Sequence, residues 1–206
     1  MAQSYPDLED VGRRWQRHWN IDGLSELTMG GLWVLWGVAF GLPKLLPEGG
    51  WTKVYWSFAP LVLMASGAAS SWVMKRLKEK FTYRRAGYAA PAEARPLVRI
   101  SVAGLAAGIA AGVALLARRG APEELAAPAL ALVLAAALLV PVIRWRLTHF
   151  AVLSGIALVL SFVLGAAPLP LDSGMIAVLL TMGTASMVVG WIRLRRFLRL
   201  PPGDAE

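Results

Sequence analysis

Few side chains in this chain could do chemistry, and their spacing does not assemble a catalytic set. His149 stands at the start of an apolar run, with Arg144 shortly before it. A histidine without an orienting partner is a weak candidate for a general base, so an interfacial structural role fits His149 better. Ser154 and Gly155 form a small-residue pair, but no Gly-x-Ser-x-Gly elbow surrounds them. A lipid-modifying enzyme would need a polar pocket near His149 and Arg144.

The sequence also lacks the residue patterns that bind metals and cofactors. It contains no cysteine, which removes disulfides, thiolate metal sites and cysteine catalysis. No spaced group of Asp, Glu and His suggests metal-dependent lipid chemistry. We therefore predict no catalytic residue, no metal, no cofactor, no enzymatic activity and no nucleic-acid partner.

The apolar runs carry no ionisable residue near their middle. Charges inside a bilayer are costly and are usually functional. All thirteen acids fall in loops, termini or helix ends. This pattern argues against a transporter built on a buried carboxylate and against an arginine voltage sensor. A passive pore, or a carrier that uses backbone carbonyls, stays open.

Four residues are the candidates for a solute pathway. Pro60 lies inside the second apolar run, where proline frees a backbone carbonyl and can kink the helix, although a tolerated kink is the simpler interpretation. Thr181, Thr184 and Ser186 form a polar side of the last apolar run. A water-filled cavity lined by these residues would indicate a transporter or channel. A dry core of Ala, Leu and Val would indicate an interaction protein.

Small residues at four-residue spacing predict close helix contacts. Gly104, Gly108 and Gly112 share one side of the third apolar run, and Gly37 and Gly41 repeat the spacing in the first. In lipid, small residues let helix backbones approach closely, and this packing replaces the missing hydrophobic drive. These glycines could pack within one bundle or form the interface of a homo-oligomer.

All of these residues must be positioned by membrane helices, each of which needs about 20 mostly apolar residues. Hydrophobic residues make up 57% of the 206-residue chain and charged residues 17%. Soluble domains are nearer to about half apolar and about a quarter charged. Six runs have the length of a span: 28–46, 54–74, 100–117, 125–143, 147–167 and 174–192.

The basic residues predict the orientation of these spans. With the N-terminus inside, seventeen of the 21 Lys and Arg residues fall in inner segments and four in outer segments. Lys and Arg concentrate on the cytoplasmic side of short loops. The chain is therefore predicted to be a multi-pass protein of the cytoplasmic (inner) membrane, with its N-terminus and C-terminus in the cytoplasm.

The connection at residues 75–99 is the longest, and its first part is predicted to extend the second span by about two helical turns. Residues 75–85 of this connection hold six basic residues: Lys75, Arg76, Lys78, Lys80, Arg84 and Arg85. Each basic residue near an anionic leaflet adds about 1 kcal/mol of attraction. We predict that these residues contact anionic lipid headgroups or an acidic partner. The simpler alternative is that they only set the topology.

Residues 8–19 predict an amphipathic helix before the first span. Its apolar face is formed at spacings of three and four by Leu8, Val11, Trp15 and Trp19. A basic amphipathic helix lies in the membrane interface with its apolar side down. Packing on the inner ends of the bundle is the alternative.

Residues 81–88 read Phe-Thr-Tyr-Arg-Arg-Ala-Gly-Tyr. This segment resembles a Thr-Tyr-Pro-Arg-x-Gly-Tyr loop found in some uncharacterised small bacterial polytopic membrane proteins. Arg84 stands where that pattern has proline. The resemblance covers eight residues and implies no function.

We predict an all-α polytopic membrane protein with six transmembrane helices arranged as three antiparallel hairpins. An N-terminal interfacial segment (1–27) precedes the transmembrane domain (28–192), and a short basic tail (193–206) follows it. The predicted function is a non-enzymatic accessory, regulatory or scaffold component that acts by helix packing and through a basic cytoplasmic face. Its partner would be a homo-oligomer copy or another membrane subunit. A small transporter or channel for an unknown solute is the alternative.

Overall fold

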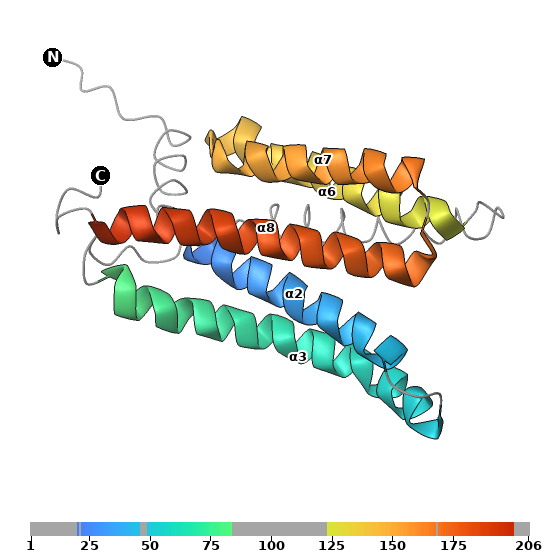
Figure 1. The fold of residues 1–206 in the computed structure, drawn as a ribbon. Coiled ribbons are helices and arrows are strands. Elements are labelled where there is room, and N and C mark those ends of the chain that lie inside the picture. Colours follow the sequence, from blue (N-terminus) through green and yellow to red (C-terminus); the bar gives the residue numbers. More distant parts are fainter. Residues whose placement is uncertain (1–19, 21, 46–48, 84–122, 168, 200–206) are drawn as a thin grey trace, which may run out of the picture.

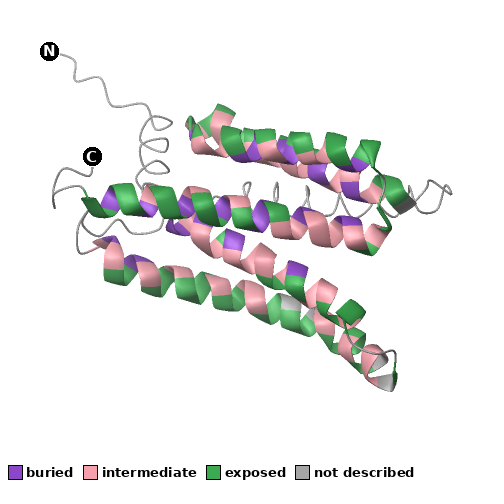
Figure 2. Ribbon diagram, in the orientation of Figure 1, coloured by how far each residue is buried: buried purple, intermediate pink, exposed green. Residues whose placement is uncertain are grey.

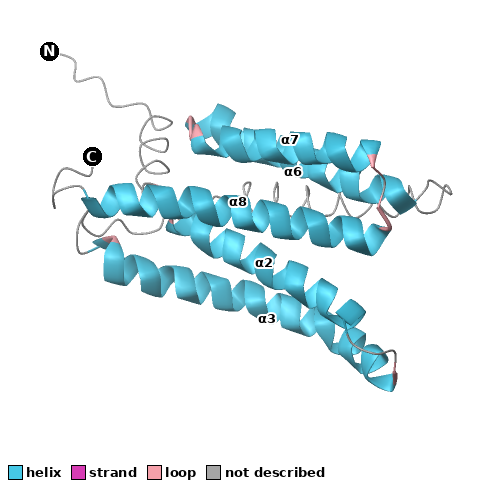
Figure 3. Ribbon diagram, viewed as in Figure 1, coloured by secondary structure: helices cyan, strands magenta, loops and turns pink. Residues whose placement is uncertain are grey.

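The computed structural model describes residues 20, 22–45, 49–83, 123–167 and 169–199. Regular structure in these residues is helical throughout (Figure 3), which confirms the predicted all-α class. The elements are α2 (Leu24–Leu45), α3 (Gly50–Phe81), the short 3-10 helix η1 (Glu123–Leu125), α6 (Ala126–Trp145), α7 (His149–Ala166) and α8 (Leu171–Arg199).

The last helix, α8, occupies the centre of the described bundle (Figure 1). It packs along α2 on one side and meets the α6/α7 hairpin on the other, while α3 packs on α2. The first and last long helices are therefore neighbours in space. The end where α2 begins and α8 ends carries many of the Lys and Arg residues, and we call it the basic end.

Four helices are long and apolar enough to cross a membrane: α2, α6, α7 and α8. Helix α3 covers the second predicted span and continues to Phe81, so the predicted two-turn extension is confirmed. Helix α3 is not among these four helices. The predicted span at 100–117 and the predicted helix at 8–19 lie outside the described residues, so six spans stay a prediction.

Glycines at seven-residue spacing bring α2 and α8 into backbone contact. A Cβ added to Gly30 would lie 2.6 Å from the Gly183 carbonyl oxygen, and one added to Gly190 would lie 2.7 Å from the Gly23 carbonyl oxygen. Gly37 continues this series toward Leu180. Seven residues are close to two helical turns, so these glycines share one face. The two helices run antiparallel, because early residues of α2 meet late residues of α8.

An alanine strip and two serines join α6 to α7. Ala127, Ala131 and Ala135 are buried on one face of α6. Ser154 of α7 donates a hydrogen bond to the Ala135 carbonyl at 2.8 Å, and Ser161 donates to the Pro128 carbonyl at 2.8 Å. Each serine thus satisfies its hydroxyl on a neighbouring helix, which lipid could not do.

The connection between α6 and α7 is as short as predicted, and it makes the two helices antiparallel neighbours. Arg146 adopts the left-handed conformation, with φ 55° and ψ 37°, and ends α6. Its backbone N–H and that of Leu147 both point to the Pro141 carbonyl. A single left-handed residue therefore turns the chain, in the manner of a helix C-cap.

Helix α3 is the most loosely covered of the long helices (Figure 2). Two polar contacts tie it to α2: the Trp36 indole donates to the Ser66 hydroxyl at 2.8 Å, and the Tyr55 hydroxyl donates to the Ala39 carbonyl at 2.6 Å. Large apolar side chains are exposed along α3 at Val54, Leu61, Met64, Trp72 and Val73, and Trp56, Phe58 and Val62 are also exposed although they line a cavity between α3 and α2.

Candidate functional site

A buried group of charged side chains gathers at the basic end, and we call it the ionic cluster. It consists of Asp22, Glu26, Lys78, His149 and Arg193. These residues come from the turn before α2 and from α2, α3, α7 and α8, so the cluster connects four helices. Asp22, Lys78 and Glu26 are almost completely buried, at 0%, 1% and 2% exposure.

Glu26 is the centre of one half of the cluster. Its Oε1 lies 2.5 Å from Arg193 Nη1 and 2.6 Å from His149 Nε2. Arg193 also donates through Nη2 to the backbone carbonyl of Asn20. Arg193 therefore links α8 to the turn before α2. His149, the first residue of α7, links that helix to Glu26.

The contact geometry constrains the proton on His149. Nε2 lies close to both Glu26 Oε1 and Arg193 Nη1, the second at 2.7 Å. A carboxylate oxygen only accepts hydrogen bonds, so an Nε2 that bonds to Glu26 must carry a proton. Arg193 donates to the same oxygen. Glu26 Oε1 thus collects two donors, whereas its Oε2 is buried and has no hydrogen-bond partner among the described residues.

Asp22 is the centre of the other half. Its Oδ1 accepts a hydrogen bond from the Leu24 N–H at 3.0 Å, which helps to start α2. Its Oδ2 accepts from the Thr82 hydroxyl at 2.5 Å and lies 3.6 Å from Lys78 Nζ. Burial lowers the pKa of the Lys78 ammonium, and the nearby Asp22 carboxylate opposes that shift because it favours the charged form.

The composition of the cluster is that of buried structural ion pairs that join helix ends. The acids Asp22 and Glu26 lie within ion-pair distance of the cations Lys78 and Arg193, respectively. Removing one partner of such a buried pair is costly because it leaves an uncompensated charge. Asp22, Glu26 and Lys78 are closed off from solvent, while His149 and Arg193 keep 14% and 19% of their side chains exposed; in this arrangement the five side chains hold helix ends together.

The structure separates the residues predicted to contact anionic lipid. Lys75, Arg76 and Lys80 are exposed on α3. Lys78 does not belong with them, because it turns inward to Asp22 and is buried; the expectation of a surface role for Lys78 is wrong. Arg84 and Arg85 lie outside the described residues.

The predicted packing glycines divide in the same way. Gly37 is buried against Leu180, and a Cβ on Gly41 would meet Ile176 at ordinary contact distance, so both lie at the α2/α8 contact. Gly104, Gly108 and Gly112 lie outside the described residues, and their packing role stays a prediction.

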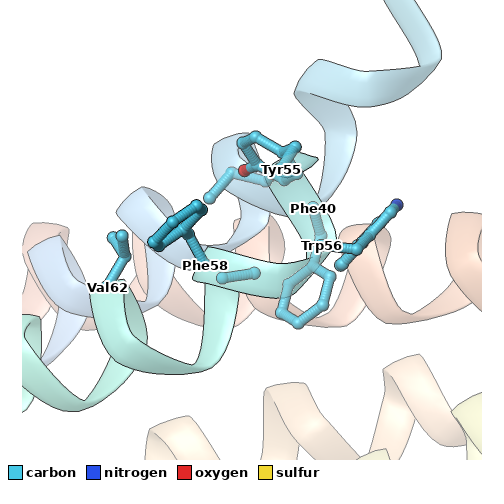
Figure 4. A pocket seen from close by; sticks show the side chains of 7 residues that line it. Phe40, Tyr55, Trp56, Phe58 and Val62 are labelled. Atoms are coloured by element: carbon cyan, nitrogen blue, oxygen red, sulfur yellow. The ribbon is translucent and has the colours of Figure 1, made fainter. Parts of the chain in front are cut away.

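The predicted pathway residues are divided between two helices, α8 and α3. Thr181 and Thr184 are exposed on α8, Ser186 is buried on it, and Pro60 lies within α3. A cavity of about 100 Å³ instead lies between α2 and α3 (Figure 4), lined by Ala39, Phe40, Tyr55, Trp56, Phe58, Ala59 and Val62. The hydroxyl of Tyr55 is already bonded to a backbone carbonyl. This cavity is apolar, and no ionisable acid or base lines it among the described residues.

Sequence reasoning missed the ionic cluster, although a signal was present. Asp22, Glu26 and Gly30 follow one another at four-residue spacing, so they share a helix face. An acid on the face that carries close-packing glycines must be buried and needs a cationic partner. Lys78 and Thr82 show the same spacing on α3. His149 contacts Glu26 and Arg193, and no single segment of the sequence could reveal these partners; its interfacial structural role stays a prediction.

Comparisons of the chain with protein-family models, with curated proteins and with solved structures found no match. The resemblance of residues 81–88 to a bacterial membrane-protein loop stays a prediction.

Proposed function

We propose that this protein is a non-enzymatic component of the cytoplasmic membrane that acts as an accessory, regulatory or scaffold subunit. It would act by packing its helices against another membrane protein or a second copy, and through its basic end. The four helices that could cross a membrane make it a candidate multi-span protein. In the proposed orientation the basic end faces the cytoplasm.

The observation that carries this proposal is the apolar core of the described bundle. Its buried core is made of alanine, leucine, valine and methionine: Ala127, Ala131, Ala135, Leu153, Ala157, Leu164, Val178 and Met182. The fully buried charges sit at one end and are paired with one another. A bundle with this interior is better suited to holding a shape than to passing a polar solute.

The outward side of α3 is the surface best suited to a protein partner in the membrane. Among the described helices, α3 packs mainly on α2. Large apolar and aromatic side chains cover its free side, including Phe58 and Met64. Aromatic and methionine side chains are enriched where proteins contact partners.

The basic end supplies the second surface. Two of its cations, Lys78 and Arg193, form ion pairs within the ionic cluster. Among the described residues, the exposed cations of this end are Lys75, Arg76, Lys80, Arg144, Arg146, Arg195, Arg196 and Arg199. Each adds about 1 kcal/mol of attraction to an anionic leaflet, so this end would sit firmly on an anionic surface.

A matched pair of photocrosslinking variants tests the packing function. Phe58 on α3 and Phe162 on α7 are both exposed phenylalanines, at 58% and 72%. Each would be replaced by p-benzoylphenylalanine in the full chain and irradiated in native membranes. We expect a discrete protein adduct from position 58 and mainly lipid adducts from position 162.

Two results would contradict the proposal. One is that position 58 yields lipid adducts alone, which would mean that α3 meets no protein. The other is that the purified wild-type protein releases a trapped solute from liposomes, which would favour the small transporter or channel.

A further inference from the structure

Two aromatic and basic pairs occupy equivalent places on α3 and α8. The Arg76 guanidinium carbon lies 5.4 Å from the Trp72 ring centroid, and that of Arg195 lies 5.0 Å from the Trp191 ring centroid. In each pair the arginine follows the tryptophan by four residues, so the helix itself sets the stacking. Both indoles are well exposed, Trp72 at 61% and Trp191 at 49%.

The neighbouring cation on each helix points the other way. Lys78 follows Arg76 by two positions, and Arg193 precedes Arg195 by two positions. Two residues correspond to a rotation of roughly 200° about a helix axis. The inward cations bind Asp22 and Glu26. The outward arginines are exposed, and no carboxylate of the described part of the chain is within ion-pair distance of them.

A stacked, outward guanidinium has a specific binding preference. It is planar, stays charged, and keeps its N–H edge free to grip two oxygens of a phosphate while its face rests on a ring. Indole rings favour the headgroup level of a bilayer. The phosphodiester of an anionic phospholipid lies at that headgroup level, and its headgroup carries no compensating positive charge. Such a phosphate suits both the guanidinium and the indole of each pair.

We infer that Trp72 with Arg76, and Trp191 with Arg195, form two sites for the phosphate of an anionic phospholipid at the basic end. This inference rests on the proposed membrane placement of that end, and it names the ligand and residues more narrowly than a general basic face does. The two sites lie on the outer sides of helices whose inner sides close the ionic cluster. Bound lipid would therefore contact both α3 and α8 next to the ionic cluster.

Lipid retention by the purified full-length protein tests the sites. The protein would be titrated in detergent with phosphatidylglycerol or phosphatidylcholine, and retained lipid would be measured by native mass spectrometry. R195Q and R76Q should each weaken phosphatidylglycerol binding by more than the roughly fivefold loss expected for one basic residue near an anionic surface, because the stacked phosphate contact is lost as well. W191L and W72L should weaken it as well, although their charge is unchanged. R195K should not restore full binding, because lysine lacks the planar fork.

The matched control is R196Q, which removes the same charge from the next position of α8 and should have a smaller effect. Far-UV circular dichroism and size-exclusion profiles would verify that each variant is folded, and R195K provides a variant that keeps charge and bulk. If R195Q and R196Q weaken binding equally and both tryptophan variants bind like wild type, the specific sites are refuted while the basic face survives. If wild type does not prefer phosphatidylglycerol, the basic-face part of the proposed function fails as well.

Discussion

Glu26, in the first turn of α2, lies 2.6 Å from His149, the first residue of α7, measured from Oε1 to Nε2. This contact ties the α6/α7 hairpin to the antiparallel α2/α8 pair. Arg193 of α8 meets the same oxygen, so three helices converge on one carboxylate atom. The contact needs a proton on Nε2, which makes the donor property of His149 its essential feature.

Replacing His149 tests that property. H149L removes the donor beside a buried carboxylate and should destabilise the protein by about 1–3 kcal/mol. H149Q supplies an amide N–H donor and should lose less than about 1 kcal/mol. The free energy of unfolding can be measured by denaturant titration in detergent micelles. Equal losses for the two variants would show that the hydrogen bond to Glu26 does not matter.

The Asp22–Lys78 pair should behave as a buried ion pair. D22N alone strands the buried Lys78 ammonium, and K78M alone strands the Asp22 carboxylate, so each should cost about 3–5 kcal/mol. The double variant D22N/K78M should be more stable than the worse single variant, since neither charge is then left alone. The same denaturant titration gives all three values.

An exposed ion pair between α2 and α8 provides the control for this buried ion pair. Lys44 lies 3.5 Å from Asp172 at the opposite end of α2 and α8, and both side chains are open to solvent. D172N should change stability by no more than about 1 kcal/mol. A loss at Asp172 as large as the loss at Asp22 would mean that burial is not the cause.

The glycine contact between α2 and α8 predicts opposite outcomes for two adjacent residues. A Cβ on Gly30 would lie 2.7 Å from the Met187 backbone nitrogen, whereas one on Gly31 would meet nothing within 4 Å. G30A should destabilise by about 1–3 kcal/mol through overpacking. G31A should be neutral or stabilise by up to about 1 kcal/mol, because alanine favours helix more than glycine does. Similar effects at both positions would contradict the close approach of α2 to α8.

Disulfide crosslinking can test the same helix pairing in native membranes, and the chain has no cysteine of its own to interfere. A Cβ on Gly41 would lie 3.8 Å from the Cδ1 and 3.9 Å from the Cγ2 of Ile176, so the two positions face each other across the α2/α8 contact, and bridged cysteines need Cβ atoms about 3.5–4.5 Å apart. With a protease site inserted between residues 84 and 99, within the predicted connection at 75–99, oxidised G41C/I176C should keep the cleaved halves together. The control G31C/I176C should let them separate.

The sequence predicted the helices well because hydrophobic length is a local property. The turn between α6 and α7 and the extension of α3 to Phe81 could be read from residues that are adjacent in the chain. The predicted start of the last span at residue 174 was late, since α8 already begins at Leu171. It also continues to Arg199, within the predicted tail. Basic residues do not end a helix, and a polar end can extend beyond the apolar part.

The ionic cluster could not be predicted in the same way, because its partners are brought together only by tertiary packing. Lys78 sits among five other basic residues in the sequence, and nothing local distinguishes it from Arg76. Only the helix rotation, set by the contact of α3 with α2, turns Lys78 toward Asp22 and Arg76 outward. A basic segment therefore contains both a structural cation and surface cations.

The central claim is that Glu26 and Arg193 form one energetic unit that fastens α2 to α8, and a double-mutant cycle tests it most directly. E26Q and R193M would be measured singly and together by denaturant titration in micelles. We predict that each single variant loses about 3–5 kcal/mol and that the double variant loses no more than the worse single one. Losses that add to within about 0.5 kcal/mol would mean that the two residues are independent. Such a result would rule out a coupling of α2 to α8 through this ion pair.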